Sequence, residues 1–275
     1  MATLSPKELL LLAERKGLCL PAFDVAGGQA DFLVGVLSAC EAARCPAVLL
    51  VYAPAGAYGS FETCAKVVRL FAEQASVPVV LHLDHGRDEG VVTAALEAGF
   101  DSVMFDGSGC SLAENTRRTK AMARIAHAHG ALIEGELGRI GGDVTDPDEA
   151  AAFVRETRVD LLAPAVGNAH GFYRQPPKLR FELIERIAAA TARPLSLHGG
   201  TGIPTADVLR AGRLGMRKMN IATGLHQRFV DAVRSNVEQV PPAPFTWADA
   251  LTAGRQAVEA EAAEWIRGLQ CEGLV

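Results

Sequence analysis

The chain has 275 residues, 49% of them hydrophobic, and a formal charge of −5 at pH 7. This acidic balance, without Lys/Arg runs interleaved with aromatic residues, argues against a nucleic-acid partner. No stretch approaches the roughly 20 apolar residues that span a bilayer, so no membrane partner is expected. The six cysteines are scattered without a CxxC pair, which is typical of reduced thiols in a cytoplasmic protein.

The first element expected is a helix that precedes the repeating part of the chain. Ser5–Glu8 has the form of a capping box with proline at the first helical position, and Gly17 is expected to end the helix. The apolar run 9–12 is too short for a signal peptide and is followed by charged residues. The segment is therefore predicted to cap the fold.

Short apolar runs then alternate with helical patterns. Such runs are typical of strands buried on both faces of a parallel sheet. Eight are expected, at residues 19–24, 47–52, 78–83, 101–105, 131–136, 160–164, 194–198 and 218–221. The helical stretches that follow them lie at residues 28–44, 61–75, 87–98, 113–129, 147–157, 179–191, 205–213 and 224–237.

Eight strand–helix units predict a (β/α)₈ TIM barrel. Asp146 and Thr205 are candidate N-caps for two of the helices. No linker or shift in composition divides the chain, so we expect one domain over residues 1–275, with a C-terminal helical extension. A doubly wound sheet is the alternative, but Phe23–Gly28 after the first strand lacks the GxGxxG pattern.

Three histidines follow strand-like runs, and each precedes a glycine: His85, His170 and His198. The C-terminal strand ends of a barrel meet at one mouth, where three imidazoles and a free position make an open zinc site. The third strand is ambiguous, because His82 shares strand parity with Asp84, whereas His85 needs a turn at the following glycine. A buried histidine that merely satisfies hydrogen bonds is the better explanation for any one of them, but not for three.

Further polar residues are expected at the same mouth. They end or follow the fourth, fifth and eighth strands, as Asp106, Glu134, Glu136 and Asn220. Asp84 can move a proton to or from a substrate hydroxyl, or it can orient a ligand histidine, and position alone does not decide. Gly199–Gly202 and Asn220–Gly224 follow strands seven and eight, where such barrels usually bind phosphate.

Five motifs, taken in order, resemble class II, zinc-dependent ketose-bisphosphate aldolases. They lie at residues 81–85 (LHLDH), 134–138 (EGELG), 167–171 (GNAHG), 198–202 (HGGTG) and 218–223 (KMNIAT). The resemblance runs from about Leu4 to the C-terminus. The group includes the fructose-bisphosphate and tagatose-bisphosphate enzymes, so it implies cleavage of such a sugar phosphate into dihydroxyacetone phosphate and an aldehyde.

The resemblance also implies a role for each matching residue. Zinc would be bound by His85, His170 and His198, while Asp84 would transfer the proton at the C4 hydroxyl and Asn220 would lie near the reacting carbons. Asp106 and Glu136 match positions that can hold a second or displaced metal. The dihydroxyacetone-phosphate half would contact Gly171, Gly199, Thr201, Asn220 and Thr223.

The resemblance also implies a contact between subunits. Arg255 resembles an arginine that binds the distal phosphate, in some members across a subunit boundary. A homodimer or homotetramer is therefore expected. A monovalent cation is a further cofactor that such a site can take.

The chain departs from the family pattern at the segment after the fifth strand, at the end of the first strand and just after the eighth. Val144 stands where a mobile loop carries a glutamate, so Asp143 or Asp146 replaces it or proton exchange at the dihydroxyacetone-phosphate carbon is impaired. Asp24 replaces an asparagine, and Ala222 replaces the Asp or Asn of many fructose-bisphosphate enzymes. These changes indicate an aldehyde other than plain glyceraldehyde 3-phosphate, or relaxed stereochemistry at C4.

Two rival functions are weighed, and four other side chains receive plainer interpretations. A metal-dependent hydrolase usually has His-x-His after the first strand, which is missing here, and a non-catalytic sugar-phosphate sensor would bind ligand without turnover. His226 is expected to be solvated, and Lys218 to lack the activating neighbour that a Schiff-base lysine needs. Trp247 and Trp265 are expected in packing or subunit contacts.

Overall fold

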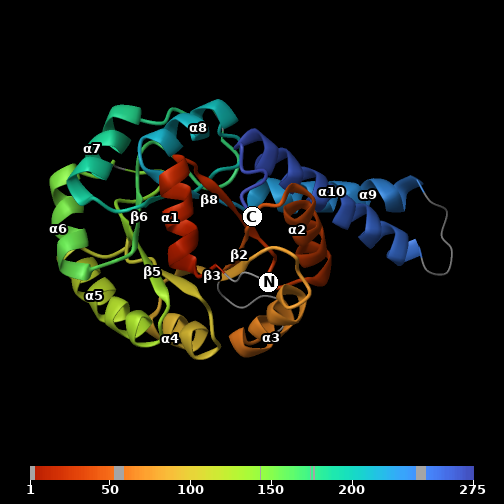
Figure 1. Ribbon diagram of the computed structural model, residues 1–275, viewed down its shortest axis with the longest axis horizontal. Helices are drawn as coiled ribbons and strands as arrows, with labels where there is room; N and C mark the ends of the chain where they lie inside the picture. The colour runs from red at the N-terminus through yellow and green to blue at the C-terminus, as the bar shows by residue number, and fades with distance from the viewer. Residues whose placement is uncertain (1–3, 53–58, 143, 174, 176, 240–245) are drawn as a thin grey trace.

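Eight parallel strands pair in chain order and close into a barrel, as the sequence predicts (Figure 1). The computed structural model describes residues 4–52, 59–142, 144–173, 175, 177–239 and 246–275. The strands are β1 (Leu20–Asp24), β2 (Ala47–Tyr52), β3 (Val79–Gly86), β4 (Ser102–Phe105), β5 (Leu132–Leu137), β6 (Leu161–Pro164), β7 (Leu195–Leu197) and β8 (Met216–Ile221). All of β1 and nearly all of β2 are buried, which explains their continuous apolar sequence.

Helices surround the barrel, and the last two extend to one side of it (Figure 1). They are α1 (Pro6–Lys16), α2 (Ala30–Ala43), α3 (Phe61–Ala72), α4 (Glu89–Glu97), α5 (Leu112–Ala128), α6 (Pro147–Thr157), α7 (Phe181–Thr191), α8 (Thr205–Arg213), α9 (Thr223–Gln239) and α10 (Thr246–Gly268). Helix α10 packs against α9 and α2. At Gly35 on α2, an added Cβ would lie 2.8 Å from the Arg255 carbonyl oxygen, so the two backbones approach closely.

Helix α1 closes the end of the barrel opposite the expected site. Leu9 of α1 is buried, and Leu20 and Val48 at the starts of two strands lie beside the same helix. The predicted capping box at Ser5 is present, and Gly17 ends the helix in the left-handed conformation. Both sequence predictions for this helix are confirmed.

One predicted helix cap is confirmed and one is wrong. Asp146 caps α6, where its Oδ1 accepts hydrogen bonds from the backbone N–H groups of Asp148 and Glu149. Thr205 is instead the first residue of α8, because the extended Pro204 takes the cap position. The Thr205 methyl group packs against Gly268, where an added Cβ would lie 2.8 Å away.

The six cysteines are free thiols, and five of them are buried. Burial raises the pKa of Cys40 and Cys271 to about 12 and that of Cys64 to about 11. These thiols therefore pack as small apolar side chains. Within the described part of the chain, no helix is both long and apolar enough to cross a membrane.

Replacing Asp146 tests whether its role is structural. Asp146→Ala removes both hydrogen bonds to the first turn of α6 and should lower the stability of folding by about 1 kcal/mol. Urea denaturation should show this loss, while Asp146→Asn, which keeps the acceptor, should match the wild type. If Asp146→Ala kept full stability, the cap would not be its main role.

Candidate active site

A turn at the end of β3 brings both Asp84 and His85 to the mouth of the barrel. The register between β3 and β4 shifts between Leu83 and Gly86, and His85 has a positive φ of 50°. This left-handed backbone costs about 1–3 kcal/mol for a residue other than glycine and is concentrated at functional sites. An added Cβ on Gly86 would lie 2.7 Å from Val92 and 2.8 Å from the Met104 carbonyl oxygen, so only glycine fits there.

The same turn settles the ambiguity between the two histidines of this strand. His82 is buried inside the barrel, where its Nδ1 lies 2.9 Å from Ser102 Oγ. His85 faces the other two predicted histidines. Its Nε2 lies 3.1 Å from His170 Nε2 and 3.0 Å from His198 Nδ1.

The three ring nitrogens fit one metal ion. Tetrahedral zinc with Zn–N bonds of 2.0–2.1 Å places its nitrogen ligands about 3.3–3.4 Å apart. The observed separations are close to this value, and all three rings present a nitrogen to the same point. Neighbouring imidazoles cannot all hydrogen-bond to one another through these atoms, whereas a cation satisfies the lone pairs of all three.

Carboxylates hold the outer sides of two of these rings. Asp106 Oδ2 lies 3.1 Å from His85 Nδ1, and Glu134 Oε1 lies 2.6 Å from His198 Nε2. Such contacts fix the orientation of a metal-ligating imidazole. His85, Asp106 and Glu136 also form a second group whose ligand atoms lie within 4.8 Å of one another, which matches the predicted second metal position.

The charges around the histidines favour a cation. Burial lowers the pKa of His170 to about 4. Burial has the same effect on His85, but Asp84, Asp106 and Glu136 outweigh it and raise the pKa of His85 to about 9. Burial and the adjacent Asp106 raise the pKa of Glu136 to about 7, and Glu136 Oε2 is buried without a hydrogen bond. These carboxylates leave negative charge that a metal ion can neutralise.

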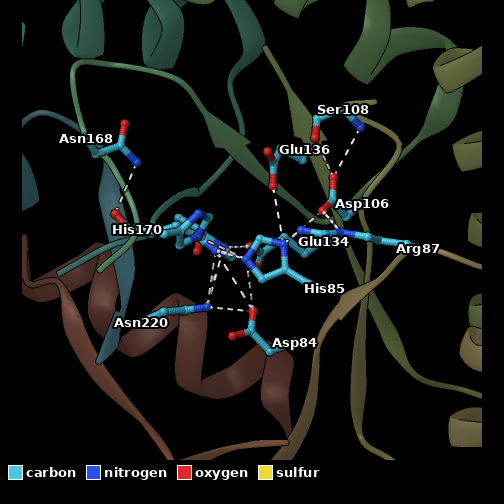
Figure 2. Close-up of polar contacts among 12 residues, drawn as sticks. Asp84, His85, Arg87, Asp106, Ser108, Glu134, Glu136, Asn168, His170 and Asn220 are labelled. Atoms are coloured by element: carbon cyan, nitrogen blue, oxygen red, sulfur yellow. Dashed lines mark hydrogen bonds and ion pairs between the residues drawn. The ribbon is translucent and has the colours of Figure 1, made fainter. Parts of the chain in front are cut away.

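Asp84 occupies the opposite side of His85 from Asp106 and Glu136 (Figure 2). Its Oδ1 accepts a hydrogen bond of 2.9 Å from Asn220 Nδ2, but lies 3.8 Å from the nearest nitrogen of His85. Burial favours the neutral form of Asp84, but His85 and His198 outweigh it and lower its pKa. Other carboxylates orient the histidines, so Asp84 is not needed for that task, and it lines the cavity instead.

The histidines and Asp84 lie at one side of a cavity of about 680 Å³. The predicted phosphate loops form another part of its wall. Thr201 Oγ1 accepts a hydrogen bond of 3.0 Å from the Gly224 backbone N–H, which ties the two loops together at the start of α9. Nine predicted residues line this cavity: Asp84, His85, His170, Gly171, His198, Gly199, Thr201, Asn220 and Thr223.

Comparison with known proteins agrees with this arrangement. The family model described as fructose-bisphosphate aldolase class-II matches residues 4–274. The chain belongs to the class II fructose-bisphosphate aldolase family. It is 36% identical to a sulfofructosephosphate aldolase of Alkalicoccus urumqiensis, over 97% of this chain and 96% of the relative. It is 39% identical to a fructose-bisphosphate aldolase of Geobacillus stearothermophilus, over 88% of each chain.

A solved structure of a family member has the same fold. The crystal structure of the YdjI aldolase from Escherichia coli K12 matches with a TM-score of 0.89 and 35% identity, over 99% of both chains. The resemblance seen in the five sequence motifs is thereby confirmed.

Two further residues named in the sequence analysis, Arg255 and Asp146, are not among the described residues that line this cavity. Arg255 lies on α10, where its Nη1 is 3.9 Å from Asp31 Oδ1. Asp146 caps α6 and lines a separate groove together with Val144, so its substitution for the aldolase loop glutamate stays a prediction. Asp143 lies outside the described residues.

The structure corrects the interpretation of His226. Its Nε2 lies 2.9 Å from Asp24 Oδ1, its ring packs 4.9 Å from that of Phe32, and it lines the cavity. His226 is therefore part of the aldolase cavity and not merely solvated. Nothing in the spacing of the sequence joins residues 24 and 226, since only closure of β1 onto β8 brings them together.

Lys218 has neighbours that the sequence did not reveal. Its Nζ lies 2.9 Å from Glu134 Oε2 and 2.6 Å from Asn220 Oδ1, and the residue is buried. These contacts pair Lys218 with a carboxylate and hold its Nζ against an amide oxygen. A lysine held in this way is a poor nucleophile, so the expectation that no Schiff base forms stays a prediction.

The choice between His82 and His85 can be tested by the same exchange at each site. His85→Asn should reduce the metal content of the purified protein, because it removes one of three converging nitrogens. His82→Asn should retain the metal, since His82 faces Ser102. Elemental analysis of both variants measures this difference, and full metal occupancy in His85→Asn would exclude it as a ligand.

Proposed function

We propose that the chain is a zinc-dependent aldolase that reversibly cleaves a ketose 1,6-bisphosphate of the fructose or tagatose type. The products would be dihydroxyacetone phosphate and an aldehyde such as glyceraldehyde 3-phosphate. One observation carries the proposal: three imidazole nitrogens converge beside Asp84, whose carboxylate is not used to orient them. Family membership and the names of the relatives support it.

Zinc is the metal that the donor set favours, because neutral imidazoles suit it. His85, His170 and His198 would bind it. When bound, the ion supplies Lewis-acid stabilisation of the negative charge that develops beside the ketose carbonyl. Asp106 and Glu136 would hold a second or displaced ion next to His85.

The remaining roles belong to the chain's own residues. In cleavage, Asp84 would accept the proton of the C4 hydroxyl as the C3–C4 bond breaks, and it would return that proton in condensation. Asn220 holds Asp84 in place through its amide. The loops around Thr201 and Thr223 would bind the phosphate through backbone N–H groups and hydroxyls, with Gly171 and Gly199 beside them.

A second candidate substrate is a ketose 1-phosphate whose far end is not a phosphate. Among the described residues that line the cavity, the cationic Arg87 is already paired with Asp106, and His226 with Asp24. A distal phosphate would have to compete with these carboxylates. The sulfofructosephosphate aldolase among the relatives shows that family members differ in the substrate they are named for.

The distal phosphate could also be bound by Arg255 of a second copy of the chain. We infer a homodimer or homotetramer because α9 and α10 project from the barrel and carry exposed apolar residues, with Trp247 65% exposed and Val237 54% exposed (Figure 1). Exposed apolar surface of this kind marks protein contacts.

The proposal is tested by a coupled assay for dihydroxyacetone phosphate. Fructose and tagatose 1,6-bisphosphates should each be compared with the corresponding 1-phosphates, with chelator and after zinc is added back. Chelator-sensitive release supports the aldolase. Binding of these sugar phosphates without any release would instead indicate a sensor on the same fold.

Asp84→Asn should retain bound zinc but lose turnover by about 10²–10⁴-fold, the usual contribution of a general acid or base. The amide keeps the shape of the carboxylate but cannot accept the proton. Steady-state rates and elemental analysis of the same preparation separate proton transfer from metal binding. Unchanged turnover would remove Asp84 from the mechanism.

Arg255→Ala should reduce kcat/KM for bisphosphates more than for 1-phosphates, because only the former carry a distal phosphate. Arg228→Ala offers a control, since this exposed arginine is paired with Glu261. Equal loss on both substrate classes would show that Arg255 does not bind the distal phosphate. Analytical ultracentrifugation of both variants would check that the assembly is retained.

A further inference from the structure

We propose that Lys218 is a positioning residue that fixes the orientation of the Asn220 amide. The inference rests on the proposed aldolase function. Neighbouring strands place the two side chains together, because Lys218 pairs with Ser196 across β7 and β8, and Asn220 lies two residues further along β8 on the same face. Both side chains are buried in the barrel.

The ammonium group makes two hydrogen bonds, to Asn220 and Ser196, and one ion pair, with Glu134. Lys218 Nζ lies 2.6 Å from Asn220 Oδ1, 3.1 Å from Ser196 Oγ and 2.9 Å from Glu134 Oε2. The carboxylate balances the charge, which a buried cation requires. If the amide oxygen of Asn220 moved away, a buried N–H group of Lys218 would therefore be left without an acceptor.

An ammonium group only donates hydrogen bonds, so the side of the amide that faces Lys218 must be its oxygen. Because the amide is planar, Nδ2 then points the other way, where it donates to Asp84 Oδ1 at 2.9 Å. A flipped amide would bring its oxygen against the Asp84 carboxylate and its NH₂ group against the ammonium. Both contacts are repulsive, so Lys218 selects one of the two orientations.

This selection serves the reaction. Nδ2 has two hydrogens, and only one is needed by Asp84. The same nitrogen lies 3.4 Å from His198 Nδ1, the atom directed at the metal centre. The locked amide thus presents a donor to the point where Asp84 and the three histidines meet. There it holds Asp84 and can bind a substrate oxygen.

Lys218→Met removes the ammonium but keeps the side-chain length. It should lower kcat by about 10²-fold, the scale expected when a reacting group is misplaced, without a matching rise in KM or loss of zinc. The matched control, Lys66→Met, removes an exposed lysine and should be unchanged. In an Asn220→Ala background, Lys218→Met should cause no further loss. An equal loss in both backgrounds, or recovery of activity with added zinc, would overturn the proposal.

The single exchange leaves Glu134 buried without its cation, which can impair folding. Lys218→Met/Glu134→Gln avoids this, because it is neutral and keeps an acceptor for His198. Measured with saturating zinc, it should show a lower kcat than Glu134→Gln alone. Equal kcat values for these two proteins would contradict the role of Lys218.

A substrate-free measurement separates this inference from the proposed function. In protein labelled with ¹⁵N at asparagine, the Asn220 side-chain amide should exchange its hydrogens slowly in the wild type. Exchange should be faster in Lys218→Met/Glu134→Gln. If the wild type releases no dihydroxyacetone phosphate from any ketose phosphate, the proposed function fails, yet this comparison still decides the positioning role. Unchanged exchange would overturn it.

Discussion

The bridge that Glu134 makes between Lys218 and His198 is the contact on which the site depends. One carboxylate oxygen lies 2.6 Å from the imidazole and the other 2.9 Å from the ammonium, and the residue is fully buried. A buried carboxylate is stable only when its charge is matched and its oxygens are bonded. His198 forms a hydrogen bond with one oxygen of Glu134, and Lys218 places its positive charge beside the other. The need to match this one buried charge therefore positions two residues. His198, a candidate metal ligand, lies on one side of Glu134, and Lys218, which supports Asn220, lies on the other.

The carboxylates of the site have different roles, which depend on where each one lies. Asp106 and Glu134 lie behind the histidines and orient them, and Glu136 adds negative charge beside His85. Asp84 lies on the cavity side and bonds to Asn220 instead. A carboxylate that oriented a ligand could not also exchange protons freely with a substrate. Separating the two tasks lets the same small volume hold a cation and keep a base ionised next to it.

Sequence reasoning recovered the features that follow from strand periodicity and chain order. The eight strands, the closed barrel and the placement of His170 and His198 at one mouth follow from apolar runs that end in polar residues. The choice of His85 over His82 needed more, because it depends on a backbone turn with positive φ that strand parity does not encode. The Asp24–His226 contact was also hidden, since it joins the two ends of the barrel across 202 residues.

The wall of the cavity combines loops built from backbone groups and small residues with longer, charged side chains. The loops proposed to bind phosphate present backbone groups and small residues around Thr201 and Gly224. Two longer side chains, Arg87 and His226, also line the cavity, and each is paired with a carboxylate. Arg87 is coupled to the candidate metal site, because Asp106 Oδ2 lies 3.0 Å from Arg87 Nε and 3.1 Å from His85 Nδ1. Under the proposed function, an exchange at Arg87 would therefore affect both the cavity wall and the orientation of a candidate ligand histidine.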